Sequence, residues 1–197
     1  RVFQEFVEKL DLRDITLVVH DFGGPIALPV GFDDPARIKR LVIINTWMRS
    51  VKGERDIERA AMIVGNRFGR ILFEWANLSL RILMPAAYAD KRKLTKKIHQ
   101  HYLDRFSRRR DRGRVLWTLG KSLLGSAAFY ESLWERRDQL KNLPALILWG
   151  LKDPAFKPHY LERWKEILPD AQIVEFENAG HWAHEEVPEK VIDALTS

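Results

Sequence analysis

The stretch LVVHDFGGPIALPVGFDDP, residues 17–35, places an aspartate at a turn between two different sequence patterns. A β-branched run ends at Val19, and a helix is expected from about Gly24. Only a few residues connect the two, and the adjacent glycines Gly23 and Gly24 allow the strand and the helix to approach closely. The sequence therefore predicts that Asp21 stands at the apex of a sharp strand–turn–helix bend.

Asp21 has both a structural and a chemical interpretation at this bend. Aspartate is a preferred helix N-cap, so the residue can be explained without any chemistry. A side chain at the apex of such a bend also projects above the sheet beside a helix N-terminus, which is the layout of a nucleophile elbow. A cap does not require two consecutive glycines after it, so the rest of the chain has to decide between the two.

Four short β-branched runs predict strands, and helical patterns lie between them. Three of the runs are nearly continuous in apolar residues, which is typical of strands buried on both faces of a parallel sheet. This alternation predicts an α/β fold. Residues 48–140 carry no strand signal and are predicted to form a helical cap between two core segments, residues 1–47 and 141–197. The predicted strands are residues 15–19, 41–45, 145–149 and 172–176.

Two further polar residues follow later strands. Asp153, in LILWGLKDPAF, comes just after the third strand, and His181, in VEFENAGHWAHEE, follows the fourth. Each alone has an ordinary explanation as a loop residue. Parallel strands joined by right-handed crossovers end at the same edge of a sheet, so Asp21, Asp153 and His181 are predicted to meet there as nucleophile, acid and base. His184 is a rival base, but it lies further into the following segment.

The composition is that of an ordinary globular protein, with 46% hydrophobic and 30% charged residues. No apolar run approaches the roughly 18 residues that a membrane helix needs, and the first residues do not have the layout of a signal peptide. The absence of cysteine excludes disulfides and thiolate catalysis in this chain. We therefore expect a cytoplasmic protein without membrane partners.

The net charge of +6 raises the question of nucleic acid binding. Residues 91–114 hold eleven Lys and Arg residues, and the spacing of Arg105, Arg108, Arg109 and Arg112 predicts one basic stripe on a single helix. A solvated helix face explains such a stripe. We find no stacking aromatics and no recognisable binding module beside it, so a nucleic acid partner is not expected.

With these residues assembled, the chain resembles the α/β-hydrolase superfamily, and within it the haloalkane dehalogenase branch. The resemblance is carried by VVHDFGGPIAL, RLVIINTWM, LILWGLKDPAF and FENAGHWAHEEVPE. It implies a partial α/β-hydrolase fold, with a parallel sheet, flanking helices and an all-helical cap insertion. The part of the family fold that precedes the elbow, with its earlier strands and one oxyanion loop, is expected to be missing from this chain.

The resemblance also implies a mechanism. Asp21 would attack an sp³ carbon, displace a halide and form an alkyl ester. His181 would then activate water to hydrolyse the ester, and Asp153 would orient the imidazole. Neither a metal nor an organic cofactor is implied, and the expected partners are a small hydrophobic substrate and water.

The chain departs from the family pattern after the nucleophile. That family usually has Trp there, whose indole N–H helps to hold the departing halide, whereas this chain has Phe22. The predicted surroundings of the oxyanion and the leaving group are Phe22, through its backbone N–H, together with Asn45 and Trp47. Pro29 is expected to kink the helix that follows the bend.

Two alternatives stay open. An epoxide hydrolase would need two cap tyrosines to protonate the epoxide oxygen, and Tyr88, Tyr102 and Tyr130 are candidates. A non-catalytic relative would use the cap and its basic residues to bind a partner. Side chains of Asp21 and His181 that point apart would favour this second alternative.

Overall fold

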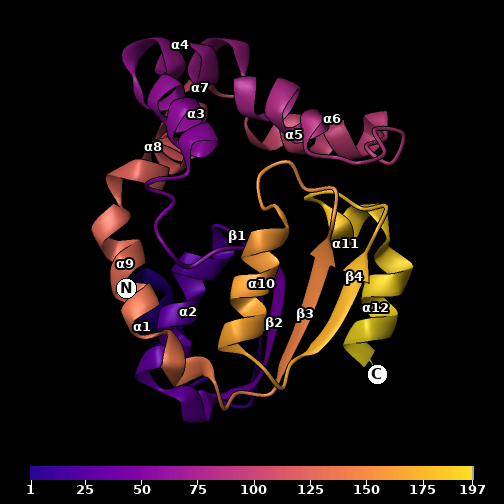
Figure 1. Cartoon of the computed structure of the whole chain (residues 1–197). Coiled ribbons are helices and arrows are strands. Elements are labelled where there is room, and N and C mark those ends of the chain that lie inside the picture. Colours follow the sequence, from indigo (N-terminus) through magenta and orange to yellow (C-terminus); the bar gives the residue numbers. More distant parts are fainter. Residues whose placement is uncertain (197) are drawn as a thin grey trace.

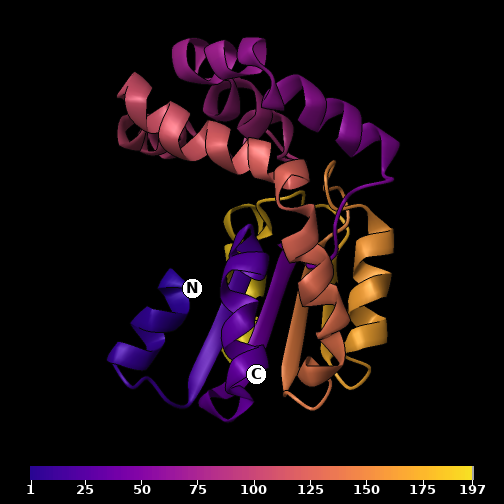
Figure 2. The same cartoon turned by 90° about the vertical axis from the view of Figure 1, so that its left-hand side faces the viewer.

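A computed structural model describes residues 1–196 and shows a four-stranded, entirely parallel sheet with helices on both faces (Figures 1 and 2). The strands lie in the order β1-β2-β3-β4, so each is the neighbour of the next along the chain. The predicted α/β fold and its four strands are confirmed. The bounds are β1 Ile15–Asp21, β2 Ile38–Thr46, β3 Ala145–Gly150 and β4 Gln172–Phe176.

The register brings the carboxyl ends of all four strands to one edge. Asp21 at the end of β1 pairs with Thr46 at the end of β2, and Gly150 at the end of β3 pairs with Phe176 at the end of β4. The loops that carry polar residues after each strand therefore open on the same side of the molecule, as parallel topology requires.

Alternate residues of β2 point into two separate hydrophobic cores, one on each face of the sheet. Leu41 and Ile43 belong to the larger core, under α1, α2 and α10. Val42 and Ile44 belong to the smaller core, under α11 and α12. Burial on both faces explains why this strand is apolar without alternation. These helices are α1 Val2–Lys9, α2 Gly23–Asp33, α10 Pro158–Ile167, α11 Ala183–Glu186 and α12 Pro188–Thr196.

Strand β1 differs from the prediction of burial on both faces. Leu17 and Val19 are buried in the larger core, but Val18 on the opposite face is 50% exposed. The smaller core is built from β2, β3 and β4. Strand β1, an edge strand of the sheet, does not contribute to it. An apolar run therefore did not distinguish a central strand from a terminal one.

The helix α2 continues through Pro29 and ends at Asp33. Proline has no N–H, so one hydrogen bond to the preceding turn is missing. Every residue from Ala27 to Phe32 is buried, and this packing holds the segment helical in spite of the lost bond.

Among the described residues, every regular element between β2 and β3 is a helix or a helical turn, joined by irregular segments. Figure 1 shows α3 to α8 above the carboxyl edge of the sheet, whereas α9 runs back down beside α2. Helices thus occupy the stretch for which a helical cap was expected, but α9 and the turn after it pack on the core. The α-helices of this stretch are α3 Arg55–Gly65, α4 Arg67–Ala76, α5 Met84–Ala86, α6 Lys96–Arg105, α7 Arg109–Asp111, α8 Thr118–Gly125 and α9 Ala127–Glu135. It also contains the π-helical turns η2 Ser79–Leu83 and η3 Arg112–Trp117 and the 3₁₀ turn η4 Arg137–Leu140. A further 3₁₀ turn, η1 Pro35–Arg37, lies between α2 and β2.

The predicted single basic helix is wrong. Helix α6 ends at Arg105, and α7 begins only at Arg109. Arg112 explains the break, because its guanidinium donates to the carbonyl oxygens of Phe106 at 2.9 Å and Ser107 at 2.7 Å. These tertiary hydrogen bonds replace helical ones, so Arg105 and Arg112 do not share one helix face.

Candidate active site

Asp21 is the last residue of β1 and has the backbone geometry of a sharp bend. Its φ of +49° lies in the left-handed region, which a non-glycine residue enters only where the surrounding structure holds it there. Phe22 has helical angles, and α2 begins at Gly23. The Thr46 hydroxyl, at the end of β2, donates to the Asp21 carbonyl oxygen. The predicted bend is present, with Asp21 at its apex.

The two glycines after the bend are not equivalent. A Cβ at Gly24 would lie 2.1 Å from Thr46 Oγ1 and 3.0 Å from the carbonyl oxygen of Trp47, so no side chain fits there. A Cβ at Gly23 would meet no atom within 4 Å among the residues that the structure describes. The close approach of helix and sheet therefore depends on Gly24.

Asp153 follows β3, and its carboxylate is buried and fully hydrogen-bonded. One oxygen accepts from the backbone N–H groups of Ala155 at 2.7 Å and Phe156 at 3.0 Å. The other accepts from the Asn45 amide at 3.0 Å and from His181 Nδ1 at 2.8 Å. Hydrogen bonds on both oxygens fix the carboxylate in a single orientation, facing the imidazole.

His181 lies between the two carboxylates. Its Nδ1 faces Asp153, and its Nε2 lies 3.9 Å from Asp21 Oδ2, beyond hydrogen-bond distance. Burial lowers the pKa of the imidazole, but the Asp153 hydrogen bond and the charges of Asp153 and Asp21 outweigh burial and raise the pKa above its ordinary value. A proton on Nδ1 leaves Nε2 as the acceptor that faces Asp21.

The carboxyl group of Asp21 combines partial exposure with a perturbed pKa. Its side chain is 37% exposed, so a small molecule can reach it. Burial of the rest raises the pKa of the carboxyl group, while the positive field of His181 and the backbone N–H of Phe22 oppose that rise. Perturbed titrating groups of this kind gather at functional sites.

The rival base, His184, packs against His20, which in turn contacts His181. Its ring contacts His20, with ring centroids 4.7 Å apart, and Trp182. His20 in turn donates from Nε2 to the carbonyl oxygen of His181 at 2.9 Å. Burial, reinforced by the neighbouring histidines, lowers the pKa of His20 to about 2, which makes this histidine a neutral donor. The contact between His20 and His181 was not predicted, because its one signal in the sequence is a histidine directly before Asp21.

Asn45 lies beside Asp153, at the end of β3. Its amide oxygen accepts from the Gly150 N–H at 2.8 Å, and its amide nitrogen donates to the Gly150 carbonyl oxygen and to Asp153. Both ends of the side chain are occupied by the last residue of β3 and by the loop that follows it. We therefore describe Asn45 as a support of Asp153, whereas the sequence had suggested the surroundings of the leaving group.

Trp47 lies directly against Phe22. The two rings meet edge to face, with centroids 4.8 Å apart, and Trp47 also stacks on Phe156. The indole N–H of Trp47 is buried and has no hydrogen-bond partner among residues 1–196. A buried N–H without a partner is costly to a folded protein, so its position beside the bend requires an explanation.

The three candidate tyrosines lie in different surroundings, and only for Tyr130 is the charge of Asp21 one of the causes of a raised pKa, after burial. Tyr88 and Tyr102 both donate to the carboxylate of Glu185, one to each oxygen. Tyr130 is buried against Trp47, and its hydroxyl lies 3.5 Å from Ser122 Oγ. In this arrangement, the hydroxyls of Tyr88 and Tyr102 form a pair over Glu185 and not over Asp21.

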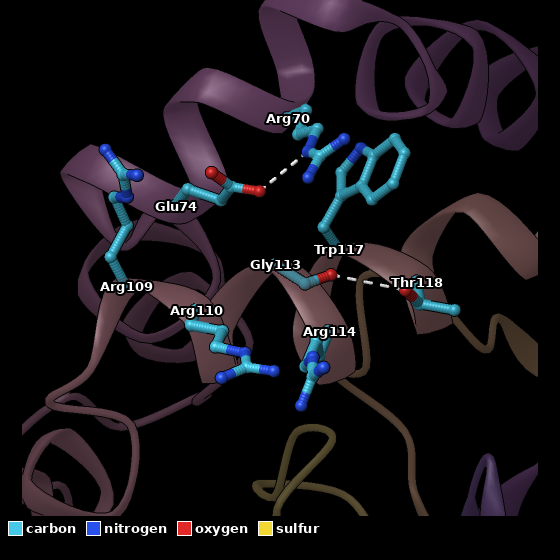
Figure 3. A pocket seen from close by; sticks show the side chains of 8 residues that line it. All are labelled: Arg70, Glu74, Arg109, Arg110, Gly113, Arg114, Trp117 and Thr118. Atoms are coloured by element: carbon cyan, nitrogen blue, oxygen red, sulfur yellow. Dashed lines mark hydrogen bonds and ion pairs between the residues drawn. The ribbon is translucent and has the colours of Figure 1, made fainter.

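A hollow of about 490 Å³ lies between α4, α7 and the π-helical turn η3 that follows α7. Figure 3 shows Arg70 paired with Glu74 there, and Arg110 and Arg114 turned away from that pair. Asp21, Asp153 and His181 are not among its lining residues. Within residues 1–196, no cluster of three or more His, Asp or Glu side chains is arranged to hold a metal ion, and no helix has the length and apolarity to cross a membrane.

A sequence profile of the alpha/beta hydrolase fold matches residues 1–188, almost the whole chain. The chain belongs to the alpha/beta hydrolase fold family. Among curated members, it is 31% identical over 197 residues to a cis-3-alkyl-4-alkyloxetan-2-one decarboxylase of Shewanella oneidensis, an alignment that covers 96% of this chain and 61% of that protein. It is 26% identical to haloalkane dehalogenase 2 of Mycobacterium bovis, with 99% of this chain and 68% of that protein covered.

Solved structures agree with this alpha/beta hydrolase architecture. A variant of the haloalkane dehalogenase DatA from Agrobacterium tumefaciens superposes with a TM-score of 0.85 at 20% identity, covering 100% of this chain and 70% of that one. An epoxide hydrolase of Bacillus megaterium superposes with a TM-score of 0.75 at 20% identity, covering 98% and 72%. The chain spans 61% of the length of the two decarboxylases with which it aligns.

Proposed function

We propose that this chain carries the nucleophile, base and acid of a hydrolase that cleaves carbon–halogen bonds through an aspartyl ester. The observation that carries the proposal is the placement of His181, with Nδ1 2.8 Å from Asp153 and Nε2 3.9 Å from Asp21. In the first step, a carboxylate oxygen of Asp21 attacks the sp³ carbon in line, and the halide leaves with the bonding electron pair.

The second step hydrolyses the ester. His181 Nε2 takes a proton from water, and the hydroxide attacks the Asp21 carboxyl carbon. Asp153 stabilises the imidazolium that forms, and the backbone N–H of Phe22 donates to the oxyanion. As the tetrahedral species collapses, His181 returns its proton to the departing alkoxide, which leaves as the alcohol. The carboxyl group of Asp21 then loses the remaining proton to solvent, which restores the carboxylate.

An aspartate nucleophile favours substrates that react at a saturated carbon. Attack of Asp21 on an ordinary ester would give an anhydride, whereas a serine nucleophile gives a stable acyl-enzyme. Attack on a carbon bearing a halide gives an alkyl ester, which water can cleave at the carboxyl carbon. The substrate class that we propose is therefore a small hydrophobic haloalkane.

The departing halide requires hydrogen-bond donors, and the side chain of Phe22 supplies none. We propose that Trp47 takes this role, because its buried indole N–H has no partner among the described residues and its ring contacts Phe22 at 4.8 Å. A buried N–H without a protein partner can stabilise developing negative charge without first breaking a hydrogen bond to another protein group.

A second candidate is the decarboxylation of a 3,4-dialkyl oxetan-2-one, a strained four-membered lactone. It is favoured by the 31% and 29% identity to proteins with this activity in their names, and by the absence of a side-chain donor at Phe22. Asp21 would attack C4 and break its bond to the ring oxygen, giving an alkyl ester and a free carboxylate. Loss of carbon dioxide would then form the alkene and expel Asp21, without hydrolysis.

Epoxide opening and binding without catalysis are less well supported. Epoxide opening would require two tyrosine hydroxyls over Asp21. Tyr88 and Tyr102 donate to Glu185, which leaves Tyr130 as the one candidate on which the charge of Asp21 acts among the described residues. A binding module without catalysis would have no use for Asp21 and His181 side chains that face one another.

The test is a product assay on the protein with its natural termini. Bromide release from 1-bromohexane, abolished in an Asp21→Asn variant, is the result that we expect. Alkene and carbon dioxide from a cis-3,4-dialkyl oxetan-2-one, without bromide release, would replace the first candidate by the second. Turnover of both substrate classes at undiminished rates in the Asp21→Asn variant would contradict the nucleophile itself.

A further inference from the structure

Glu186 is a buried carboxylate that the proposed chemistry does not use. Its side chain is only 1% exposed, and no Lys, Arg or His forms an ion pair with it among the residues that the structure describes. Its two oxygens accept from backbone N–H groups instead, one from Gly180 at 2.8 Å and one from Asp90 at 2.9 Å. A buried charge held only by backbone donors is costly to place, which suggests a specific use.

The two donors belong to segments that lie far apart in the sequence. Gly180 directly precedes His181, on the loop that follows β4, whereas Asp90 lies in the cap after α5. The same two segments are joined by a hydrogen bond from the His181 N–H to the carbonyl oxygen of Ala87 at 3.0 Å. Glu186 therefore lies at the junction where the cap meets the loop that carries the base.

Gly180 shows how tightly this junction is packed. A Cβ there would lie 2.5 Å from the carbonyl oxygen of Ala87 and 2.8 Å from the backbone nitrogen of Ala89. The loop before His181 thus touches the cap backbone directly, and neither segment can shift without breaking the hydrogen bonds of Glu186.

We infer that Glu186 is a positioning residue that fixes the backbone of His181 against the cap, and through it the distance from the imidazole to Asp21. This inference rests on the proposed function, since it assigns the residue to the second step, in which His181 acts on water. Formation of the ester uses Asp21 and the halide donor that we propose at Trp47, without His181, and does not depend on Glu186.

The charge of Glu186 adds a second signature. Its negative field is one of the influences that raise the pKa of His181. Removing that charge lowers the pKa of the base, a change that a purely mechanical support would not cause. The groups that act on the imidazole are Asp153 after β3, Asp21 and His20 on β1, and His184 and Glu186 on α11.

Glu185 offers a matched control. It is the neighbouring carboxylate and also joins the cap, but it accepts from the side-chain hydroxyls of Tyr88 and Tyr102 and from no backbone group of the histidine loop. A Glu185→Gln variant therefore removes a comparable charge and a comparable link to the cap without releasing the backbone before His181.

The experiment measures the two half-reactions separately by rapid quench and intact-mass spectrometry of the protein with its natural termini, using 1-bromohexane. For Glu186→Gln, we expect ester formation within about twofold of the parent, and hydrolysis slowed by about a hundredfold, the loss that a displacement of about 1 Å produces. The ester then accumulates, and the pH midpoint of hydrolysis falls. For Glu185→Gln, we expect no accumulation.

A second variant keeps the test valid if Glu186→Gln does not fold. Gly180→Ala displaces the loop from the cap but retains every charge, so hydrolysis should slow without a shift of its pH midpoint. The inference would be overturned if Glu186→Gln and Gly180→Ala slowed ester formation and hydrolysis equally. It would also be overturned if hydrolysis were unchanged in both variants. Failure of the proposed function itself would look different, because no ester would then form in the parent or in a His181→Phe variant.

Discussion

His181 Nδ1 lies 2.8 Å from Asp153 Oδ2, on the side of the imidazole ring away from Asp21. The acid therefore holds the proton on Nδ1 and leaves Nε2 free to act as a base towards Asp21. Because Asp153 receives two backbone N–H groups and the Asn45 amide, its own orientation does not depend on the histidine. The geometry of the base is thus set by elements of the rigid sheet edge.

Replacing the acid should separate the two proposed steps. In Asp153→Asn, the amide cannot stabilise an imidazolium, so we expect hydrolysis to slow by about three to four orders of magnitude, while ester formation stays close to the parent rate. The accumulated ester is measured by intact mass after mixing with 1-bromohexane. Unchanged steady-state turnover in this variant would contradict the role of Asp153.

The pH dependence follows from the raised pKa of His181. The base accepts a proton only when neutral, so hydrolysis should fall as the pH decreases through the pKa of His181. The hydrogen bond and charge of Asp153 still raise this pKa after Asp21 has lost its charge to the ester. Ester formation needs the Asp21 carboxylate and should fall only at lower pH, through a midpoint above 3.8. Between the two midpoints, the ester should accumulate, as single-turnover measurements across pH can establish. A hydrolysis midpoint below 6.5 would contradict the assignment of the cause.

Asn45 should matter for stability as well as for the acid. In Asn45→Ala, the buried N–H of Gly150 loses its acceptor and Asp153 loses a donor. We expect the free energy of unfolding to fall by about 1–3 kcal/mol for the unsatisfied groups. Urea denaturation measures this change. A variant as stable as the parent would show that water replaces the amide at both positions.

The two glycines of the bend give a paired prediction. Gly24→Ala forces a Cβ to within 2.1 Å of Thr46 Oγ1, so we expect destabilisation of about 1–3 kcal/mol from overpacking. Gly23→Ala meets no neighbour among the described residues and should change stability by less than its counterpart. Thermal unfolding of both variants makes the comparison, and a reversed order would contradict the described approach of α2 to β2.

Trp47 can be tested as the donor to the leaving group. Trp47→Phe keeps an aromatic ring beside Phe22 but removes the indole N–H, so we expect the rate of ester formation to fall by about a hundredfold. Hydrolysis of ester already formed should be less affected. Trp134→Phe provides a control, since this ring lies among cap and core residues and packs between Arg49 and Arg137. Equal effects of both substitutions would argue against a specific role for Trp47.

The sequence was sufficient to predict the strands and to predict that Asp21, Asp153 and His181 lie at the same edge of the sheet. Apolar runs located the strands, and the rule that parallel strands end at one edge brought the three polar residues together. The prediction did not depend on side-chain contacts, which is why it succeeded for residues separated by more than a hundred positions.

The supporting contacts were beyond the reach of sequence patterns. Asn45 and Glu186 act on backbone N–H groups of distant segments, and backbone groups leave no signature in the residue types. The end of α6 was missed for a related reason, since Arg112 stabilises a non-helical backbone at Phe106 through tertiary hydrogen bonds. Helical spacing describes a local preference, which such contacts override.

The intact mass of a His181→Phe variant, with its natural termini, after incubation with 1-bromohexane would show whether Asp21 is the nucleophile. Without the base, the ester cannot be hydrolysed, so we expect a protein heavier by one hexyl group, with the adduct on the peptide that contains Asp21. A folded variant that remains unmodified, while the parent protein releases bromide, would contradict the assignment of Asp21 as the nucleophile.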